Sequence, residues 1–149
     1  YYRLGGWFER AGWLAIAAGV AAAALGAFGG GWLSQTETAS ADGDVTARYE
    51  KFWRSGTPFD LEVEWRTVPG EATLSLDAAY LAHFVVETVT PAPARVAFGG
   101  DRIFYTFLVS AGTRGQAIFR LAARESGSFG GELGLVGGGS LTIRQRIYP

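Results

Sequence analysis

The chain has 149 residues, no cysteine, no methionine, one histidine and 22 glycines. This composition excludes disulfides, Cys-ligated zinc, iron–sulfur clusters, thiol nucleophiles and metal centres built from several histidines. The net charge is −1, which gives no global excess of basic charge for nucleic acid. Charged residues make up 18% of the chain, below the usual ~25%, which indicates that part of the chain avoids water.

Residues 12–33 form an apolar run without a charged side chain. A helix of that length spans ~33 Å, close to the ~30 Å of a bilayer core. Trp13 and Trp32 lie near its two ends and Trp7 precedes it, so these three residues are the expected membrane-interface anchors. The pattern predicts a single transmembrane helix over residues 12–33, preceded by a cytoplasmic tail over residues 1–11.

The flanking charges predict an orientation for this helix. Arg3 and Arg10 precede the apolar run and acidic residues follow it, which places the C-terminal part outside the cytoplasm. Arginine outnumbers lysine twelve to one, and Ala and Gly are abundant, which is typical of a GC-rich bacterial genome. We therefore expect a location in the bacterial inner membrane, with the C-terminal domain in the periplasm.

Two other interpretations of the apolar run stay open. One is a buried helix of a soluble core, although the run is longer than a domain of this size needs. The other is a cleaved signal peptide, because Ala39-Ser40-Ala41 matches an A-x-A cleavage pattern. The run is longer than the about 7–15 apolar residues of a signal peptide, so we favour an uncleaved anchor.

Small residues line one side of the predicted helix. They recur at helical spacing and would allow another helix to approach closely. The residues expected to pack against a partner helix are Gly12, Ala15, Gly19, Ala22, Gly26 and Gly30. The alternative is that genome composition alone filled the span with Ala and Gly.

A polar, acidic stretch over residues 34–46 has the composition of a flexible linker. A segment that mixes cations with aromatic residues follows it. Its members are the candidate surface docking residues Arg48, Lys51, Phe52, Trp53 and Arg54. The segment could rest on lipid headgroups or on a partner, or it could be the first element of the folded domain, with Phe52 and Trp53 in the core. Both interpretations remain open.

Residues 47–149 form the expected extracytoplasmic domain. Between Phe59 and Arg66 apolar and charged residues alternate, as in a half-buried strand. Asp77 is placed to cap a short helical turn. Similar strand-like runs are expected over residues 71–76, 84–90, 95–98, 102–109, 116–122 and 140–147. Gly- and Pro-containing turns separate them, among them glycine-rich turns at Gly130-Gly131 and at residues 137–139. About seven short strands predict a mainly-β domain, an antiparallel Ig-like β-sandwich, with a small barrel as the alternative.

The search for catalytic groups gives no site. Asp60, Glu62 and Glu64 share one face of one strand, which is typical of a solvated strand exterior, because paired-carboxylate catalysis needs groups that converge across a cleft. His83 has no second histidine to complete a metal site. The sequence contains no GxSxG, HExxH or phosphate-loop pattern. We expect no enzyme activity, no catalytic or metal-binding residues and no cofactor.

Three stretches resemble small single-span bacterial proteins that carry a β domain. They are Leu76-Asp77-Ala78-Ala79-Tyr80-Leu81, the stretch from Val89 to Val96, and the ending from Ile143 to Pro149. The resemblance covers about two-thirds of the chain and implies a membrane-anchored β domain. It brings no functional residues to this sequence.

These observations favour a non-catalytic accessory or structural subunit of a larger bacterial membrane complex. A photosynthetic reaction-centre–light-harvesting complex or a respiratory complex is the candidate assembly. The expected partners are other transmembrane subunits and the lipid bilayer, without nucleic acid. The first alternative is an independent membrane-anchored periplasmic module that binds a ligand or peptide, and the second is a hydrolase that uses scattered carboxylates.

Overall fold

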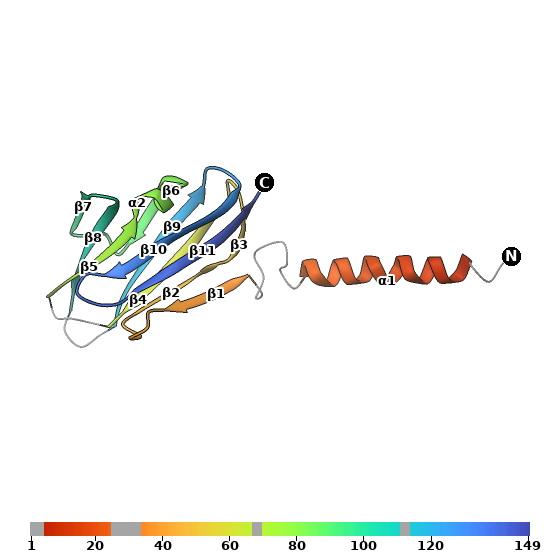
Figure 1. The fold of residues 1–149 in the computed structure, drawn as a ribbon, viewed down its shortest axis with the longest axis horizontal. Helices are drawn as coiled ribbons and strands as arrows, with labels where there is room; N and C mark the ends of the chain where they lie inside the picture. The colour runs from red at the N-terminus through yellow and green to blue at the C-terminus, as the bar shows by residue number, and fades with distance from the viewer. Residues whose placement is uncertain (1–4, 25–33, 67–69, 111–113) are drawn as a thin grey trace.

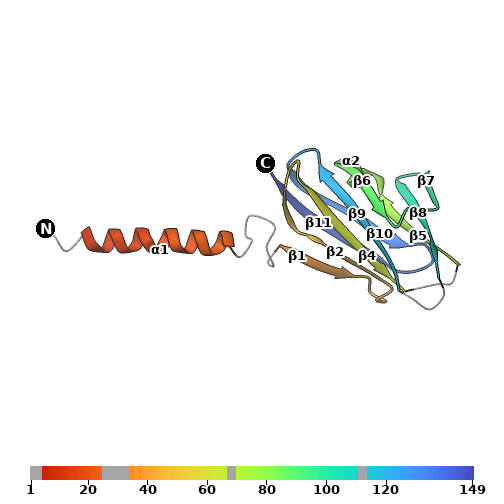
Figure 2. The same ribbon diagram turned by 180° about the vertical axis from the view of Figure 1, so that it is seen from behind.

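A computed structural model describes residues 5–24, 34–66, 70–110 and 114–149 of the chain. These residues form an N-terminal helix, α1 (Gly5–Ala24), and a β-sandwich of two sheets (Figure 1). A second, short helix, α2 (Ala78–Ala82), joins the two sheets between neighbouring strands of the chain. The view from behind shows the same separation between α1 and the sandwich (Figure 2).

Sheet A has five strands, and every neighbouring pair is antiparallel. In spatial order they are β1 (Gln35–Ala39), β2 (Val45–Glu50), β4 (Pro58–Trp65), β9 (Gly115–Ala123) and β6 (Phe84–Thr90). Sheet B has six strands, of which the first pair is parallel and the rest are antiparallel. Their order is β3 (Phe52–Arg54), β11 (Ser140–Tyr148), β10 (Gly127–Leu135), β5 (Gly70–Asp77), β8 (Arg102–Val109) and β7 (Arg95–Gly99).

The alternation in the sequence determines which side chains enter the core between the sheets. Leu61 and Val63 of β4 are fully buried, whereas Glu62 between them faces outward. On the neighbouring strand β9, Phe119 and Leu121 are also fully buried. Leu61 pairs with Phe119 and Phe59 with Leu121, and since paired residues share a face, the two strands present one continuous apolar surface.

Helix α2 closes one end of the core. The Asp77 carboxylate accepts a hydrogen bond from the Ala79 amide at 2.9 Å and so caps the helix. Tyr80 of α2 is buried and lies directly on the backbone of β10. A Cβ atom at Gly131 would lie 2.4 Å from the Tyr80 Cβ, so only glycine leaves room for Tyr80 at this position.

The predicted transmembrane helix over residues 12–33 is contradicted by the structure. Among the described residues, no helix is long and apolar enough to cross a membrane. Helix α1 begins earlier than predicted, at Gly5, and ends at Ala24. The remainder of the predicted span, residues 25–33, lies outside the described residues. The predicted inner-membrane location, with a cytoplasmic tail and a periplasmic domain, depended on this span and is corrected with it.

The sandwich itself agrees with the predicted mainly-β class, but its details differ. The described residues form eleven strands rather than about seven, and the β3–β11 pair is parallel. Residues 34–46, predicted to be a flexible linker, contain β1, which pairs with β2 along its whole length. Ser34 is fully buried, and its hydroxyl donates a hydrogen bond to the Phe52 carbonyl at 2.7 Å. The polar composition of this stretch reflects an edge strand that faces water on one side.

Replacing Gly131 by alanine tests the contact between α2 and β10. Because the new methyl group would overlap Tyr80, we expect the Gly131→Ala variant to lose at least about 2 kcal/mol of unfolding free energy. Urea denaturation followed by circular dichroism measures the loss. The control is Ser128→Ala on the exposed side of the same strand, which should change the free energy by less than about 0.5 kcal/mol. Equal stabilities of the two variants would contradict the packing described.

Candidate functional site

The three acidic residues singled out on β4 are each held by an arginine of a neighbouring strand or loop. Asp60 lies 3.4 Å from Arg120, Glu62 lies 3.6 Å from Arg48, and Glu64 lies 4.0 Å from Arg114. The charges on the outer face of sheet A are therefore largely neutralised within the protein. Exposed pairs of this kind add little stability, and they leave the carboxylates engaged rather than free to bind a cation.

Arg48, the first of the predicted docking residues, lies on the same outer face of sheet A. Its guanidinium also contacts Glu37 of β1 at 3.0 Å. The hydrogen bond to Glu37, followed by the charge of that carboxylate, raises the pKa of Arg48 above its ordinary value. Arg48 thus belongs to the paired network of sheet A.

Trp53 points toward the core side. Its indole Nε1 donates a hydrogen bond to the Thr57 carbonyl at 2.9 Å. Its ring meets that of buried Phe59 edge-on, with 6.3 Å between the ring centres. Trp53 therefore packs with the core, as in the interpretation of this segment as the first element of the folded domain.

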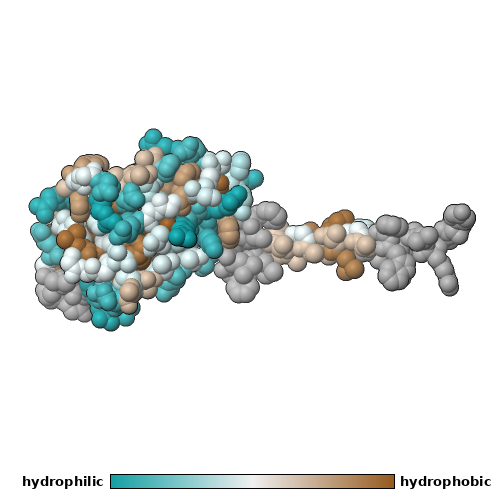
Figure 3. All heavy atoms as spheres, viewed as in Figure 1, coloured by the Kyte–Doolittle hydropathy of each residue, from teal (hydrophilic) through white to brown (hydrophobic). Residues whose placement is uncertain are grey.

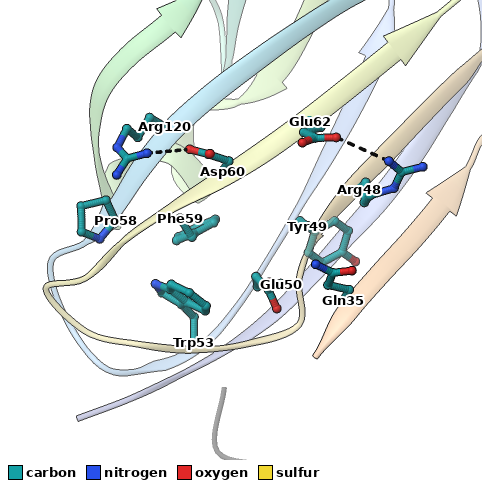
Figure 4. A pocket seen from close by; sticks show the side chains of 10 residues that line it. All are labelled: Gln35, Arg48, Tyr49, Glu50, Trp53, Pro58, Phe59, Asp60, Glu62 and Arg120. Atoms are coloured by element: carbon teal, nitrogen blue, oxygen red, sulfur yellow. Dashed lines mark hydrogen bonds and ion pairs between the residues drawn. The ribbon is translucent and has the colours of Figure 1, made fainter. Parts of the chain in front are cut away.

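Trp53 also lines a hollow of about 280 Å³ in sheet A (Figure 4). The hollow lies where β2 and β4 part, since their pairing ends at Arg48 and Glu62. Ion pairs of Arg48 and Arg120 form its rim, and Glu50 lies within it. One carboxylate oxygen of Glu50, Oε2, is buried without a hydrogen-bond partner among the described residues.

The remaining docking residues lie on the outer face of sheet B. Lys51, Phe52 and Arg54 lie at and beside β3, which pairs in parallel with the end of β11. The neighbouring outward residues of β11 are Arg144, Arg146 and Tyr148. We call this surface the basic face: Lys51, Phe52, Arg54, Arg144, Arg146 and Tyr148.

Aromatic rings form the base of the basic face. Phe52 and Tyr148 are stacked, with 6.3 Å between the ring centres and an interplanar angle of 24°. The Lys51 ammonium lies 5.7 Å from the centre of the Phe52 ring, within the range of a cation–π contact. Arg54 donates a hydrogen bond through Nε to the Pro149 carbonyl at 3.3 Å, so the end of the chain lies along the same edge.

A second hollow, of about 380 Å³, opens on the basic face. Its walls are largely apolar, and it is lined by Lys51, Phe52, Ser128, Phe129, Gly130, Arg144, Gln145 and Arg146. In the described part of the chain, no Asp or Glu carboxylate lies within 4.0 Å of Lys51, Arg54, Arg144 or Arg146. The basic face thus combines an apolar depression with three lining cations, Lys51, Arg144 and Arg146, that no Asp or Glu of the described residues neutralises.

Buried hydrogen bonds behind the basic face fix the position of β11. The Gln145 side chain, which is buried, accepts a hydrogen bond from the Tyr80 hydroxyl and donates one to the Glu50 carbonyl at 2.8 Å. The Arg144 amide donates to the Tyr49 hydroxyl at 3.1 Å. Burial raises the pKa of Tyr80 far above its ordinary value, because the phenolate would have to be desolvated.

Part of the basic face can be predicted from the sequence. Alternation along residues 140–147 predicted a strand, and residues 51–54 were already candidates for docking. The parallel pairing that brings β3 beside β11 joins residues about ninety positions apart, and no local pattern encodes it. Arg144 and Arg146 were therefore missed as members of the surface.

The predicted membrane-interface anchors and partner-helix packing residues lie outside the sandwich, on α1 or among residues that the structure does not describe. Helix α1 contains the small residues Gly12, Ala15, Gly19 and Ala22, the first three of them exposed, and Trp13 is 67% exposed. A Cβ atom at Gly12 or Gly19 would have no neighbour within 4 Å. Apolar residues are visible along the coloured part of α1 (Figure 3). Trp7 lies in α1, whereas Gly26, Gly30 and Trp32 lie outside the described residues.

The structure brings no metal-binding cluster together in the part it describes. Among those residues, no group of three or more His, Asp or Glu side chains could hold a metal ion. His83 stacks on Phe129, with ring centres 4.3 Å apart, and its Nδ1 lies 2.7 Å from Glu125. Both contacts of His83 are with side chains of the sandwich domain, and they account for the position of its ring.

No family model and no curated protein matches this chain. Among solved structures, a non-cellulosomal cohesin from the hyperthermophilic archaeon Archaeoglobus fulgidus aligns with a TM-score of 0.42 and 16% identity, over 65% of this chain and 85% of that chain. A chain of the CaDoc0917–CaCohA2 complex aligns with a TM-score of 0.40 and 13% identity, over 63% of this chain and 90% of that chain. Likenesses this distant transfer neither a partner nor an activity.

The buried Tyr80 hydroxyl predicts a loss of stability at alkaline pH. Its pKa in the folded protein is raised, whereas the unfolded chain ionises near pH 10. The stabilisation is therefore complete below about pH 10 and declines above it, by up to about 1.4 kcal/mol per pH unit. We expect Tyr80→Phe to be less stable than the parent at pH 8, by about 1–2 kcal/mol, because Gln145 loses its donor.

At pH 11 the difference should shrink, since phenylalanine does not ionise. Urea denaturation of both proteins at pH 8, 10 and 11 measures the two slopes. Burial also raises the pKa of Tyr105, so the double variant with Tyr105→Phe should be flatter still. Parallel slopes for the parent and Tyr80→Phe would contradict the burial of this hydroxyl.

Proposed function

We propose that this protein is a non-catalytic protein-binding subunit whose basic face holds an acidic, extended segment of a partner protein. One observation carries the proposal: Lys51, Arg144 and Arg146 line an apolar hollow, and no Asp or Glu carboxylate of the described residues lies within 4.0 Å of these three cations. Elsewhere in the sandwich, six arginines form ion pairs and Arg124 forms none among the described residues; the six are Arg48, Arg66, Arg95, Arg102, Arg114 and Arg120.

The chemistry of the basic face favours a particular kind of segment. Arginine can bind a carboxylate through two parallel hydrogen bonds, and Arg144 and Arg146 both present exposed guanidinium groups on β11. The hollow beside them, with walls from Phe52 and Phe129, accepts an apolar side chain. A partner segment with glutamate or aspartate on both sides of one aromatic residue satisfies both features.

This proposal retains the accessory-subunit role expected from the sequence and places its contact on the sandwich. The candidate photosynthetic and respiratory assemblies required a transmembrane helix and are not carried further. The alternative expected from the sequence, an independent module that binds a ligand or peptide, would use the same surface; its membrane anchor is not carried further. Support for a role without catalysis comes from the way the carboxylates of β4 are engaged by arginines.

Binding of a defined peptide to the full chain tests the proposal. The probe is a fluorescein-labelled peptide of alternating glutamate and serine with one central phenylalanine, and fluorescence anisotropy measures its Kd. We expect the double variant Arg144→Glu plus Arg146→Glu to weaken binding at least about tenfold, equivalent to about 1.4 kcal/mol. Higher salt should weaken binding of the parent protein, because these charges are exposed.

The matched control is Arg66→Glu plus Arg114→Glu, which changes the net charge equally but lies at the other sheet, with both side chains mostly exposed. We expect the control variant to bind within about twofold of the parent. A second probe with serine in place of the phenylalanine should bind more weakly and respond less to Phe52→Ala. Equal losses in both charge variants, or tighter binding of a single-stranded oligonucleotide than of the peptide, would contradict the proposal.

A further inference from the structure

The four edge strands of the sandwich differ in how they are protected from pairing with another chain. Strand β3 has only three residues, β6 carries a bulge between Val86 and Thr88, and β1 carries the ion-paired Glu37. Short length, bulges and charges are the devices that block edge-to-edge pairing. Strand β7 pairs with β8 in regular register and contains neither a bulge nor a proline, and its one charged residue, Arg95, lies at its first position.

Strand β7 also exposes large apolar side chains. All five of its residues are exposed, with Phe98 at 80% and Val96 at 44%. Val96 lies opposite Tyr105 of β8, and Phe98 lies opposite Ile103. Since Tyr105 is buried, the two apolar residues of β7 extend the margin of the core into solvent.

The sequence of β7 is complementary to itself. When two copies pair antiparallel about Ala97, Val96 of each copy faces Phe98 of the other, and Arg95 faces Gly99. Pairs between an aromatic and a β-branched residue stabilise antiparallel strands, and like charges directly opposite destabilise them. This register gives two favourable pairs and no charge repulsion. Arg95 keeps its own partner, Glu71, at 3.8 Å.

From this geometry we infer that β7 is a dimerisation edge, at which a second copy of this chain continues sheet B. The edge is accessible, because β7 lies at the end of the sandwich away from α1 in both views (Figures 1 and 2). A pair of five-residue strands buries less than the roughly 1,200 Å² of a stable interface. The dimer is therefore weak and depends on concentration.

Cysteine cross-linking in the full chain tests the register directly, because the sequence contains no cysteine. In the proposed dimer, the Cβ atoms of the two Ala97 residues lie opposite each other at a spacing that a disulfide can bridge. Ala97→Cys should give a disulfide-linked dimer under mild oxidation. Arg95→Cys should give at least about fivefold less, because its counterpart across the strand is Gly99. Leu108→Cys, exposed on β8, is the control for random collisions.

Sedimentation velocity over a range of concentrations provides a second measurement. The parent chain should change from monomer to dimer, and Phe98→Lys should weaken this association at least about tenfold. Leu108→Lys introduces the same charge on an exposed apolar residue outside β7 and should leave it unchanged. A chain that is monomeric at every concentration, equal cross-linking at positions 95, 97 and 108, or a dimer insensitive to Phe98→Lys would each overturn the inference.

Discussion

The buried side chain of Gln145 links three elements of the structure by hydrogen bonds. It joins α2 through the Tyr80 hydroxyl and β2 through the Glu50 carbonyl, and it lies on the last strand of the chain. A buried amide without partners would cost about 1–3 kcal/mol, so β11 has one favoured register. A slip by one residue would bring Arg144 and Arg146 into the core and send Ile143 and Ile147 to the surface. The outward positions of Arg144 and Arg146 on the basic face therefore depend on the buried hydrogen bonds of Gln145, which form in one register of β11.

The division of charge between the two sheets follows from neighbouring strands. On sheet A, Arg48 of β2 lies opposite Glu62 of β4 and Arg120 of β9 lies opposite Asp60, so each pair neutralises itself. On sheet B, the outward residues that face Arg144 and Arg146 on β10 are Gly130 and Ser128, which carry no charge. A net charge of −1 thus conceals a surface that is locally cationic, and whole-chain charge is a poor guide to what one face binds.

Alternation along single strands predicted much of the sandwich, because burial of one face requires it. The same reasoning missed β10, since Gly130 and Gly131 were interpreted as a turn. In the structure Gly131 lies within the strand because Tyr80 packs against its backbone, a requirement set by α2 and not by the neighbouring sequence. Strand β1 was missed because polar edge strands resemble linkers. The start of α1 was misjudged because composition alone indicates an apolar segment but not where a helix begins.

The basic face and the β7 edge lie at opposite ends of one sheet, since the strand order of sheet B runs from β3 to β7. Pairing two copies through β7 would therefore leave both basic faces free and place them at the two far ends of a continuous sheet. Such an arrangement binds a partner with two acidic segments more tightly than either face alone, because the second contact becomes intramolecular. A weak dimer is sufficient for this effect, since a bivalent partner would itself stabilise the paired state. The two surfaces share no residue, and their separation on sheet B allows both contacts to form at the same time.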